Sequence, residues 1–254
     1  MQAVTAVSAT CKCCGKLSPI YGVCDFNKSC EEGRGTFLPK SGLPIYYYRC
    51  EACNFLFSTA YDDFSDDDFS RVIYNDDYIK VDPDYVSARP TAKATLTATL
   101  LGPENCDISI LDYGSGAGVF EKTLRGKGFS NVQSYDPYGG EHTALPKGKF
   151  RLITCFEVFE HAVDPRHTLE SIVALMGDDA GLLFSTRIQP EEPDNPGLDW
   201  WYVGPRNGHV SIHTRNSLKI LLEASGLKFV SLGDNLHFAY RQFPAFASQF
   251  GCIF

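Results

Sequence analysis

A glycine-rich segment near the middle of the chain combines residue types that can bind a nucleoside. Residues 110–118 read Ile-Leu-Asp-Tyr-Gly-Ser-Gly-Ala-Gly, and an acid, Asp136, follows the next apolar run. The apolar residues at 108–111 predict a buried parallel strand, and the glycines predict a turn narrow enough for a ligand to approach the backbone. A helix expected from Val119 to Lys127 would direct its N-terminal amides toward that ligand and favour negative charge. Because a strand is expected over 131–135, Asp136 at its end could accept both hydroxyls of a ribose.

The loop departs from the dinucleotide-binding pattern G-x-G-x-x-G/A at one position. Counting from Gly114 and Gly116, the third small residue is replaced by Val119, where the pattern needs a small side chain for the helix to pack on the strand. Asp112 precedes the loop, and a carboxylate there would repel a pyrophosphate but can hold an ammonium group. Two alternatives stay open: a nicotinamide cofactor, and a glycine turn of a doubly wound protein that binds nothing.

The glycine loop with its two acids resembles motif I and the following acidic strand end of class I S-adenosylmethionine-dependent methyltransferases. The resemblance implies an α/β fold with a Rossmann-like sheet whose last strand is antiparallel. It also implies S-adenosyl-L-methionine as cofactor, with Asp136 on the ribose and the loop at the methionine end. The loop residues given this role are Asp112, Gly114, Ser115, Gly116 and Gly118.

Seven of the ten cysteines lie in the first 53 residues. Two C-x-x-C pairs among them, Cys11 with Cys14 and Cys50 with Cys53, have the knuckle form that presents two thiolates to one tetrahedral ion. We therefore predict a zinc-ribbon-like module over residues 1–58. Its zinc would be structural, because four thiolates leave no open coordination position.

The remaining thiols leave the ligand set open. Cys13 could replace either member of the first knuckle. Cys24 or Cys30 could join a second site.

Length and charge limit the class of protein. A chain of 254 residues can bury one substantial core and leave a small second module. The net charge of -8 argues against a nucleic-acid surface, which needs a basic face. No apolar run is long enough to cross a bilayer, and the N-terminus lacks a basic-then-apolar signal. We expect a cytoplasmic protein, whose cysteines would be thiols or metal ligands rather than disulfides.

Residues 59–104 predict an acidic and aromatic connector followed by lid helices. Residues 61–68 contain five aspartates, and such a run is usually solvated. The interleaved aromatic rings argue against disorder, because they need a surface to cover. A helix is expected from Thr91 to Leu101. By resemblance, many methyltransferases place here a lid residue that meets the methionine carboxylate, and the candidates are Tyr78, Tyr85 and Arg89.

Residues 105–254 predict the cofactor-binding sheet. Only thirteen residues, 137–149, separate Asp136 from the next buried strand, and they include two prolines and three glycines. That length leaves no room for the usual helix and third strand, so we predict a shortened region between the second and fourth strands and a sheet of six strands. The last two strands, expected at 227–232 and 236–243, must be antiparallel because only three residues join them.

The run Glu157-Val-Phe-Glu160-His161 follows the strand expected at 150–156. Ligands of open α/β sheets bind at the carboxyl ends of strands, so Phe156 and Glu157 should face the cofactor, with the ring beside the adenine. The run resembles the E-V-L-E-H signature of small-molecule methyltransferases, including quinone-biosynthesis O-methyltransferases. That resemblance suggests Glu157, Glu160 and His161 as divalent-metal ligands. The alternative is that Glu160 and His161 cap the following turn.

A second cluster, residues 199–214, contains both tryptophans and two histidines. Loops at this edge of a sheet build acceptor pockets. His209 or His213 could remove the acceptor proton, since imidazole titrates near neutral pH, with Glu160 as a further candidate. The alternative is that the tryptophans anchor the loop on the core and His213 packs beside the next helix.

The order of these motifs resembles bacterial methyltransferases with an N-terminal zinc module, a group that includes C-methyltransferases of nucleotide-linked deoxysugars. The resemblance implies in-line methyl transfer to a small-molecule acceptor. Those sugar enzymes carry a second C-terminal domain, whereas this core is expected to end near Phe254, so the sugar substrate is not carried over. O- and C-methylation stay open, as does the oligomeric state. The competing hypotheses are an NAD(P)-dependent oxidoreductase and a non-catalytic protein whose ribbon docks on a partner beside a vestigial core.

Overall fold

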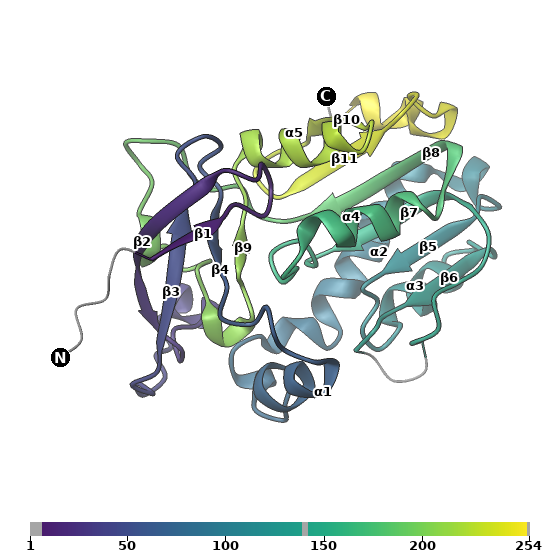
Figure 1. Cartoon of the computed structure of the whole chain (residues 1–254). Helices are drawn as coiled ribbons and strands as arrows, with labels where there is room; N and C mark the ends of the chain where they lie inside the picture. The colour runs from purple at the N-terminus through teal and green to yellow at the C-terminus, as the bar shows by residue number, and fades with distance from the viewer. Residues whose placement is uncertain (1–6, 139–141, 253–254) are drawn as a thin grey trace. The chain divides into compact units, whose positions relative to one another are not determined.

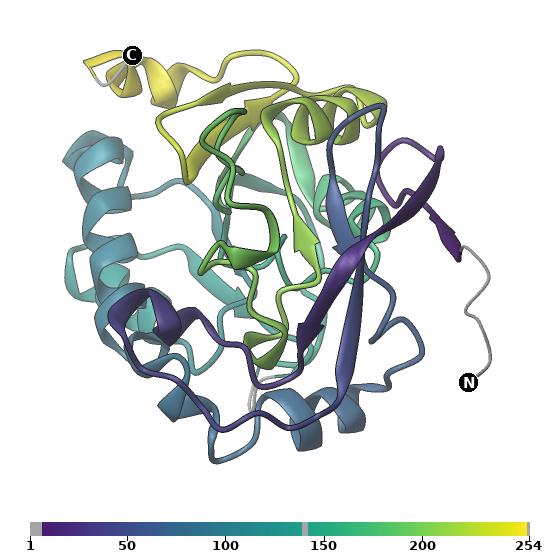
Figure 2. The ribbon, with the colours of Figure 1, turned by 90° about the vertical axis from the view of Figure 1, so that its left-hand side faces the viewer.

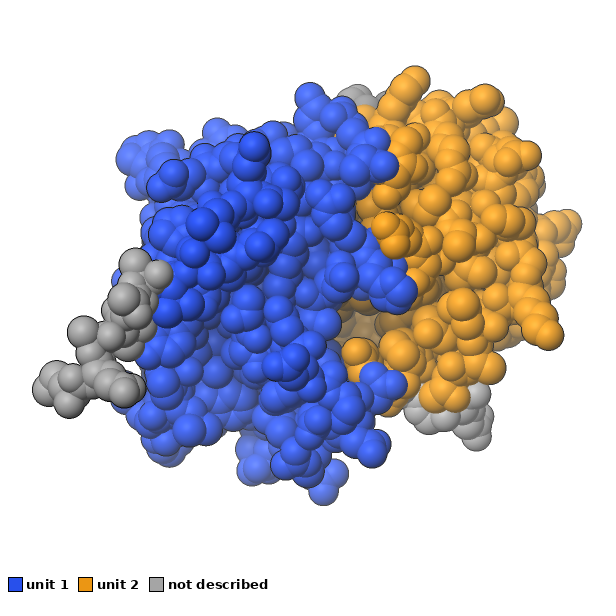
Figure 3. Space-filling view, in the orientation of Figure 1, with its two compact units in different colours: residues 1–82, 159–168, 187–224 blue, residues 83–158, 169–186, 225–254 orange. Residues whose placement is uncertain are grey.

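The computed structural model describes residues 7–138 and 142–252. The chain forms two compact units, each assembled from three segments (Figure 3). Unit 1 contains Met1–Asp82, Phe159–Thr168 and Arg187–Ala224, and unit 2 contains Pro83–Val158, Leu169–Thr186 and Ser225–Phe254. The expected division into three consecutive segments stays a prediction. Gly139 and Gly140 of the shortened connection lie outside the described residues, as do 1–6 and 253–254.

Unit 2 is built on a six-stranded mixed sheet in the order β10-β11-β8-β7-β5-β6 (Figure 1). The strands β6, β5, β7 and β8 are parallel, whereas β11 is antiparallel to both β8 and β10. The six strands and the antiparallel final strand confirm the predicted sheet. The strand bounds are Ile110–Tyr113 for β5, Val132–Tyr135 for β6, Phe150–Phe156 for β7, Met176–Ser185 for β8, Lys228–Ser231 for β10 and Leu236–Tyr240 for β11.

The connection from β6 to β7 is short, as its length predicted. Its described residues form no helix or strand, and the backbone N–H of Asp136 donates to the carbonyl of His142 at 3.0 Å. After β7 the chain forms a helix that ends at Val173, and β8 begins at Met176, which pairs with Phe150 of β7.

Two helices of unit 2 pack against one face of its sheet. They are α2, Ala88–Leu101, and α3, Val119–Gly126. Leu101 and Leu124 from these helices share one apolar cluster with Ile110 and Leu152, which are partners on β5 and β7. A 3-10 segment at Ala245–Cys252 contributes aromatic rings to the same cluster. This packing holds the loop between β5 and α3 on a rigid support.

Unit 1 contains a five-stranded antiparallel sheet in the order β1-β2-β3-β4-β9 (Figure 2). Its fifth strand comes from a distant part of the chain, because Leu56 and Phe57 pair with Ile212 and Ser211. The strand bounds are Ser8–Thr10 for β1, Leu17–Asp25 for β2, Pro44–Arg49 for β3, Leu56–Ser58 for β4 and Ser211–Ile212 for β9.

The acidic connector is ordered around its aromatic rings. A short helix, α1, spans Asp66–Asp68 and continues as a π-helical turn over Phe69–Ile73. Rings from this segment, including Phe69 and Tyr78, are buried in an apolar cluster with Trp200 and Tyr202. The acids stay on the outside, so this segment is both solvated and packed.

The chain contains two further helices, α4 at Pro165–Val173 and α5 at Arg215–Ala224. Within the described part of the chain, no helix is long and apolar enough to span a bilayer.

Candidate functional site

The glycine loop between β5 and α3 depends on backbone conformations that favour glycine. Gly114, Gly116 and Gly118 have φ angles of 82°, 52° and 70°, in the left-handed region that other residues rarely adopt. A Cβ on Gly114 would lie 2.3 Å from Cγ2 of Val158, whereas one on Gly116 would meet nothing within 4 Å. The loop is therefore closely packed on one side and open on the other.

Asp136 is joined directly to this loop. Its Oδ2 accepts a hydrogen bond from the N–H of Gly116 at 2.7 Å, and its Oδ1 accepts one from the N–H of Tyr138 at 2.8 Å. The N–H groups of Gly114 and Ser115 donate to the carbonyl of Tyr135 at 2.8 and 3.1 Å. The structure thus brings the loop and the predicted ribose-binding acid together at the ends of β5 and β6.

Asp112 is the buried acid of the site. Its carboxylate accepts a hydrogen bond from the hydroxyl of Thr154 on β7 at 3.0 Å. Burial raises the pKa of Asp112 to about 7, even though that hydrogen bond lowers it. A cation beside this carboxylate would stabilise its ionised form and lower its pKa.

Two buried hydroxyls near the loop have no hydrogen-bond partner among the described residues. They are the Oγ atoms of Ser115 and Ser134. Buried polar atoms are nearly always hydrogen-bonded in native proteins, and an exception indicates a ligand or water. The polar groups of a bound nucleoside amino acid fit this requirement.

Phe156 and Glu157 lie at the carboxyl end of β7, as predicted. Glu157 has a φ of 56°, a strained value for a residue with a Cβ. Its carboxylate accepts a hydrogen bond from the hydroxyl of Ser185, at the end of the neighbouring strand β8, at 2.6 Å. The strain is therefore held in place by two adjacent strand ends.

Lys93 of α2 lies beside two of the predicted site residues, and the sequence motifs did not point to it. Its ammonium lies 5.1 Å from the ring centroid of Phe156 and 3.8 Å from Oε1 of Glu157. Because it follows Arg89 by four residues on one helix, it shares that residue's face. This spacing is the signal that could have identified it.

The residues expected to hold the methionine carboxylate are not all in one unit. Arg89 is half-buried near the start of α2 in unit 2, and Tyr85 is exposed there. Tyr78 belongs to unit 1, where it is buried and its hydroxyl lies 3.5 Å from the carbonyl of Asn207.

Unit 1 brings together two of the predicted acceptor-side residues, Glu160 and His209, with His161, which the resemblance suggested as a metal ligand. A carboxylate oxygen of Glu160 and one ring nitrogen each of His161 and His209 lie within 4.8 Å of one another. The hydroxyl of Tyr202 donates to Oε1 of Glu160 at 2.6 Å, and its carbonyl lies 2.7 Å from Nδ1 of His209. Nδ1 of His209 is also 3.5 Å from Sγ of Cys30.

His213 lies elsewhere in unit 1. It is fully buried, its ring centroid is 4.7 Å from that of Phe55, and its Nδ1 is 3.3 Å from Oγ of Ser217 on α5. This is the packing position beside the next helix that the sequence left open as the alternative to catalysis.

The four cysteines of the two knuckles converge. Cys11 Sγ lies 3.6 Å from Cys53 Sγ, Cys14 Sγ lies 3.4 Å from Cys50 Sγ, and all four sulfurs are within 4.8 Å of one another. A tetrahedral zinc with bonds of about 2.3 Å needs sulfurs about 3.8 Å apart, so the donor set fits that ion. Cys13 is buried beside the cluster but outside the four-sulfur group.

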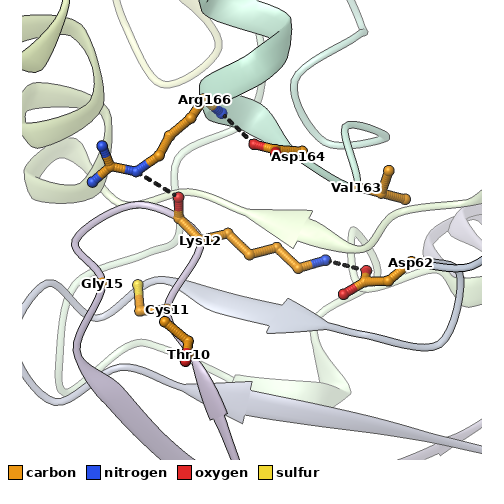
Figure 4. Close-up of a pocket in the computed structure, with 8 residues that line it drawn as sticks. All are labelled: Thr10, Cys11, Lys12, Gly15, Asp62, Val163, Asp164 and Arg166. Atoms are coloured by element: carbon orange, nitrogen blue, oxygen red, sulfur yellow. Dashed lines mark hydrogen bonds and ion pairs between the residues drawn. The ribbon is translucent and has the colours of Figure 1, made fainter.

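A shallow pocket of about 470 Å³ lies beside the first knuckle (Figure 4). Its charged groups are paired with one another or with the backbone: Lys12 with Asp62 at 2.5 Å, and Arg166 with the carbonyl of Lys12 at 3.1 Å. Arg166 also donates to the carbonyl of Cys13. These contacts join the first knuckle to the start of α4, so the charged side chains around the pocket hold these two segments together.

Comparison with known protein families identifies more than half of the chain. A family model described as a methyltransferase domain matches residues 85–232. No curated protein matches the chain.

The solved structures that this chain resembles include three methyltransferases of low sequence identity. Magnesium protoporphyrin IX methyltransferase from Synechocystis PCC 6803 with bound SAH is 16% identical over 61% of this chain and 84% of its own, with a TM-score of 0.44. CalO1, a methyltransferase in calicheamicin biosynthesis, is 17% identical over 70% and 63%, with a TM-score of 0.44. Human N-acetylserotonin methyltransferase in complex with SAM is 15% identical over 61% and 54%, with a TM-score of 0.46. This chain thus matches less than two thirds of the length of the second and third proteins.

Proposed function

Because the chain belongs to the methyltransferase domain family, we propose that it is an S-adenosylmethionine-dependent enzyme that methylates a small molecule on oxygen or carbon. The observation that carries this proposal is the hydrogen bond from the Gly116 N–H to Asp136. It joins the glycine loop and the acid at the end of β6, which are the two parts a nucleoside requires.

The cofactor's amino-acid end belongs near Asp112 in this proposal. Its ammonium would stabilise the ionised carboxylate, whose pKa burial otherwise raises to about 7. The loop residues Gly114, Ser115, Gly116 and Gly118 would pass along the cofactor backbone. Asp136 would hold the ribose hydroxyls through its remaining lone pairs.

Phe156 would flank the adenine, with Glu157 beside it at the end of β7. Arg89 and Tyr78 are proposed for the methionine carboxylate, and Lys93 joins them as a third cation or donor on the evidence of its position over Phe156. The activated methyl needs in-line alignment more than any further chemical assistance.

The acceptor half is proposed to lie around His209, with Glu160 and His213 as further candidates. The Nδ1 of His209 lies 2.7 Å from the carbonyl of Tyr202. Because a carbonyl only accepts, Nδ1 carries the proton and Nε2 keeps a lone pair. That lone pair can take a proton from an acceptor hydroxyl or an acidic C–H.

The four cysteines Cys11, Cys14, Cys50 and Cys53 are proposed to bind one structural zinc. Their convergence supports this assignment, and a closed four-thiolate shell has no position for a substrate. The small acceptor agrees with the net charge of -8, which opposes nucleic-acid binding. A cytoplasmic location stays a prediction from the sequence.

Calorimetric titration with S-adenosylhomocysteine and, separately, with NADH tests the proposed function. We expect one equivalent of S-adenosylhomocysteine to bind, no NADH to bind, and Asp136→Ala to weaken the first interaction at least tenfold. Binding of NADH alone would support the oxidoreductase hypothesis. Binding of neither ligand by folded protein would support the vestigial-core hypothesis.

A further inference from the structure

The cluster around His209 is built from two chain segments that are held side by side. The carbonyl of Glu160 accepts hydrogen bonds from the N–H groups of Val210 and Ser211 at 2.9 and 3.0 Å. The hydroxyl of Ser211 donates to the carbonyl of Ala162 at 2.6 Å. These bonds fix residues 160–162 against 209–211 within unit 1, so the approach of the three side chains follows from the backbone.

The side chains in this cluster offer three donor atoms of the kinds that metals use. One carboxylate oxygen and two imidazole nitrogens, from Glu160, His161 and His209, lie within 4.8 Å of one another. Glu160 is fully buried, and His209 is 6% exposed. A carboxylate and two imidazoles form the ligand set of many sites for divalent first-row transition metals.

Tyr202 orients two of these three donors. Its hydroxyl donates to Glu160 at 2.6 Å, and its carbonyl accepts from Nδ1 of His209 at 2.7 Å. Metal-binding histidines usually donate their other ring N–H to a carbonyl or carboxylate in this way, which fixes the tautomer and the ring orientation. A third tyrosine contact, from the hydroxyl of Tyr47 to the carbonyl of His209 at 2.6 Å, anchors the backbone.

Gly208 provides the space for the third donor. A Cβ at this position would lie 3.2 Å from Nδ1 of His161, and its φ of 86° is in the left-handed region. The turn before His209 therefore lets the ring of His161 approach the backbone closely.

We propose that Glu160, His161 and His209 bind a divalent first-row transition metal ion at a second site, separate from the four-cysteine zinc. Three protein ligands leave coordination positions open, and an oxygen atom of the methyl acceptor can occupy one of them. The metal site rests on the proposed methyltransferase function and changes the role of His209 in it. A metal bound at Nε2 would use the lone pair that otherwise takes a proton, so the metal, by binding the acceptor oxygen, would lower the pKa of that oxygen in place of the imidazole. Of the contiguous motif, Glu160 and His161 belong to this donor group and Glu157 does not, so His209 supplies the third ligand.

Cobalt(II) titration of the full-length, zinc-loaded protein tests the site directly. We expect one further equivalent of Co²⁺ to bind with weak visible d–d bands and without a thiolate-to-cobalt charge-transfer band. The missing charge-transfer band separates this site from the four cysteines. A charge-transfer band, or no binding of Co²⁺ at all, would overturn the proposal.

Variants make the assignment specific. Glu160→Gln and His209→Gln should lower Co²⁺ affinity more than about 100-fold, and Tyr202→Phe about 10-fold to 100-fold. His167→Ala, which removes an exposed histidine of α4, is the matched control and should leave the affinity unchanged. Each variant is first checked for one equivalent of zinc, which reports that unit 1 is folded. Equal Co²⁺ affinity in the folded Glu160→Gln and His209→Gln variants would also overturn the assignment.

The outcome is independent of the proposed function. Loss of Co²⁺ binding with unchanged S-adenosylhomocysteine affinity is the result expected for Glu160→Gln. If the wild-type protein binds Co²⁺ but no S-adenosylhomocysteine, the metal site stands and the methyltransferase proposal fails. If it binds S-adenosylhomocysteine but no Co²⁺, the methyltransferase proposal stands and the metal site fails.

Discussion

The hydroxyl of Thr154 lies 3.0 Å from the carboxylate of Asp112, and both side chains are buried in the sheet of unit 2. This hydrogen bond lowers the pKa of Asp112, but burial has the larger effect and raises that pKa to about 7. The acid is therefore about half protonated at neutral pH in the absence of a cation.

We expect the affinity for S-adenosylhomocysteine to depend on this proton. The ligand's ammonium favours the ionised form of Asp112, so the dissociation constant should fall as pH rises from 5 to about 7 and then level off. The slope should approach tenfold per pH unit below pH 6. Calorimetry at several pH values measures this dissociation constant. A dissociation constant that does not change with pH would show that Asp112 does not bind the ammonium group.

The variant Asp112→Asn should change cofactor affinity and protein stability in opposite directions. The pKa of Asp112 is above its ordinary value of 3.8, so its contribution to the stability of the ligand-free protein is complete below about pH 4 and is lost as pH rises toward 7. The variant should weaken binding yet raise the free energy of unfolding at pH 8, by on the order of a few kcal/mol. Denaturant titration at pH 4 and pH 8 compares the two, and a variant that is less stable at pH 8 would contradict the argument.

Gly114→Ala should abolish cofactor binding and lower stability by roughly 1–3 kcal/mol. The φ of 82° and the 2.3 Å approach to Val158 leave no room for a methyl group. Gly126→Ala is the matched control, because a Cβ there meets nothing within 4 Å and the residue lies in α3. It should stabilise the protein by about 0.5–1 kcal/mol. Thermal unfolding with and without S-adenosylhomocysteine measures both effects.

Glu157 offers a test of backbone strain at the end of β7. Its φ of 56° favours glycine, so Glu157→Gly should be more stable than Glu157→Ala by about 1–2 kcal/mol. Both variants lose the hydrogen bond from Ser185, so the difference between their free energies of unfolding reports the backbone strain alone. Equal unfolding free energies would indicate that the strain is absent in solution.

Removal of the proposed zinc should affect unit 1 most strongly. The carbonyl of Cys53 accepts a hydrogen bond from the hydroxyl of Thr214 at 2.7 Å, so the second knuckle supports the start of α5. Chelation, or Cys50→Ser, should lower the unfolding midpoint by more than about 10 °C. It should also shift the fluorescence of Trp200 and Trp201, which both belong to unit 1.

Cys106→Ser, a half-buried thiol of unit 2, is the control for this experiment and should leave the emission unchanged. If the protein has lost its metal and its tryptophan emission does not change, zinc does not contribute to the stability of unit 1.

Local patterns in the sequence predicted most of the sheet of unit 2. The buried run at 150–156 coincides with β7, and the thirteen residues before it limited the sheet to six strands. Glycine and acid spacing likewise located the loop and Asp136, because a turn and a strand end are set by neighbouring residues.

Contacts between distant segments had no such local signal. The pairing of β4 with β9 joins residues more than 150 positions apart, and nothing in the short Ser-Ile strand indicates its partner. Tyr202 lies in the predicted cluster at residues 199–214, but its contacts with Glu160 and His209 depend on how distant segments fold together. Lys93 had a local signal in its spacing from Arg89, but its contacts with Phe156 and Glu157 at the end of β7 join distant segments.

The pairing of β4 with β9 also constrains how this protein can change over generations. The cysteine ribbon is completed by a strand encoded more than 150 residues later, so it cannot be exchanged between methyltransferases as a cassette. Recombination near residue 59 would separate β1 to β4 from β9 and leave one edge of β4 unpaired. Substitutions that alter the register of one of these two strands therefore need a matching change in the other.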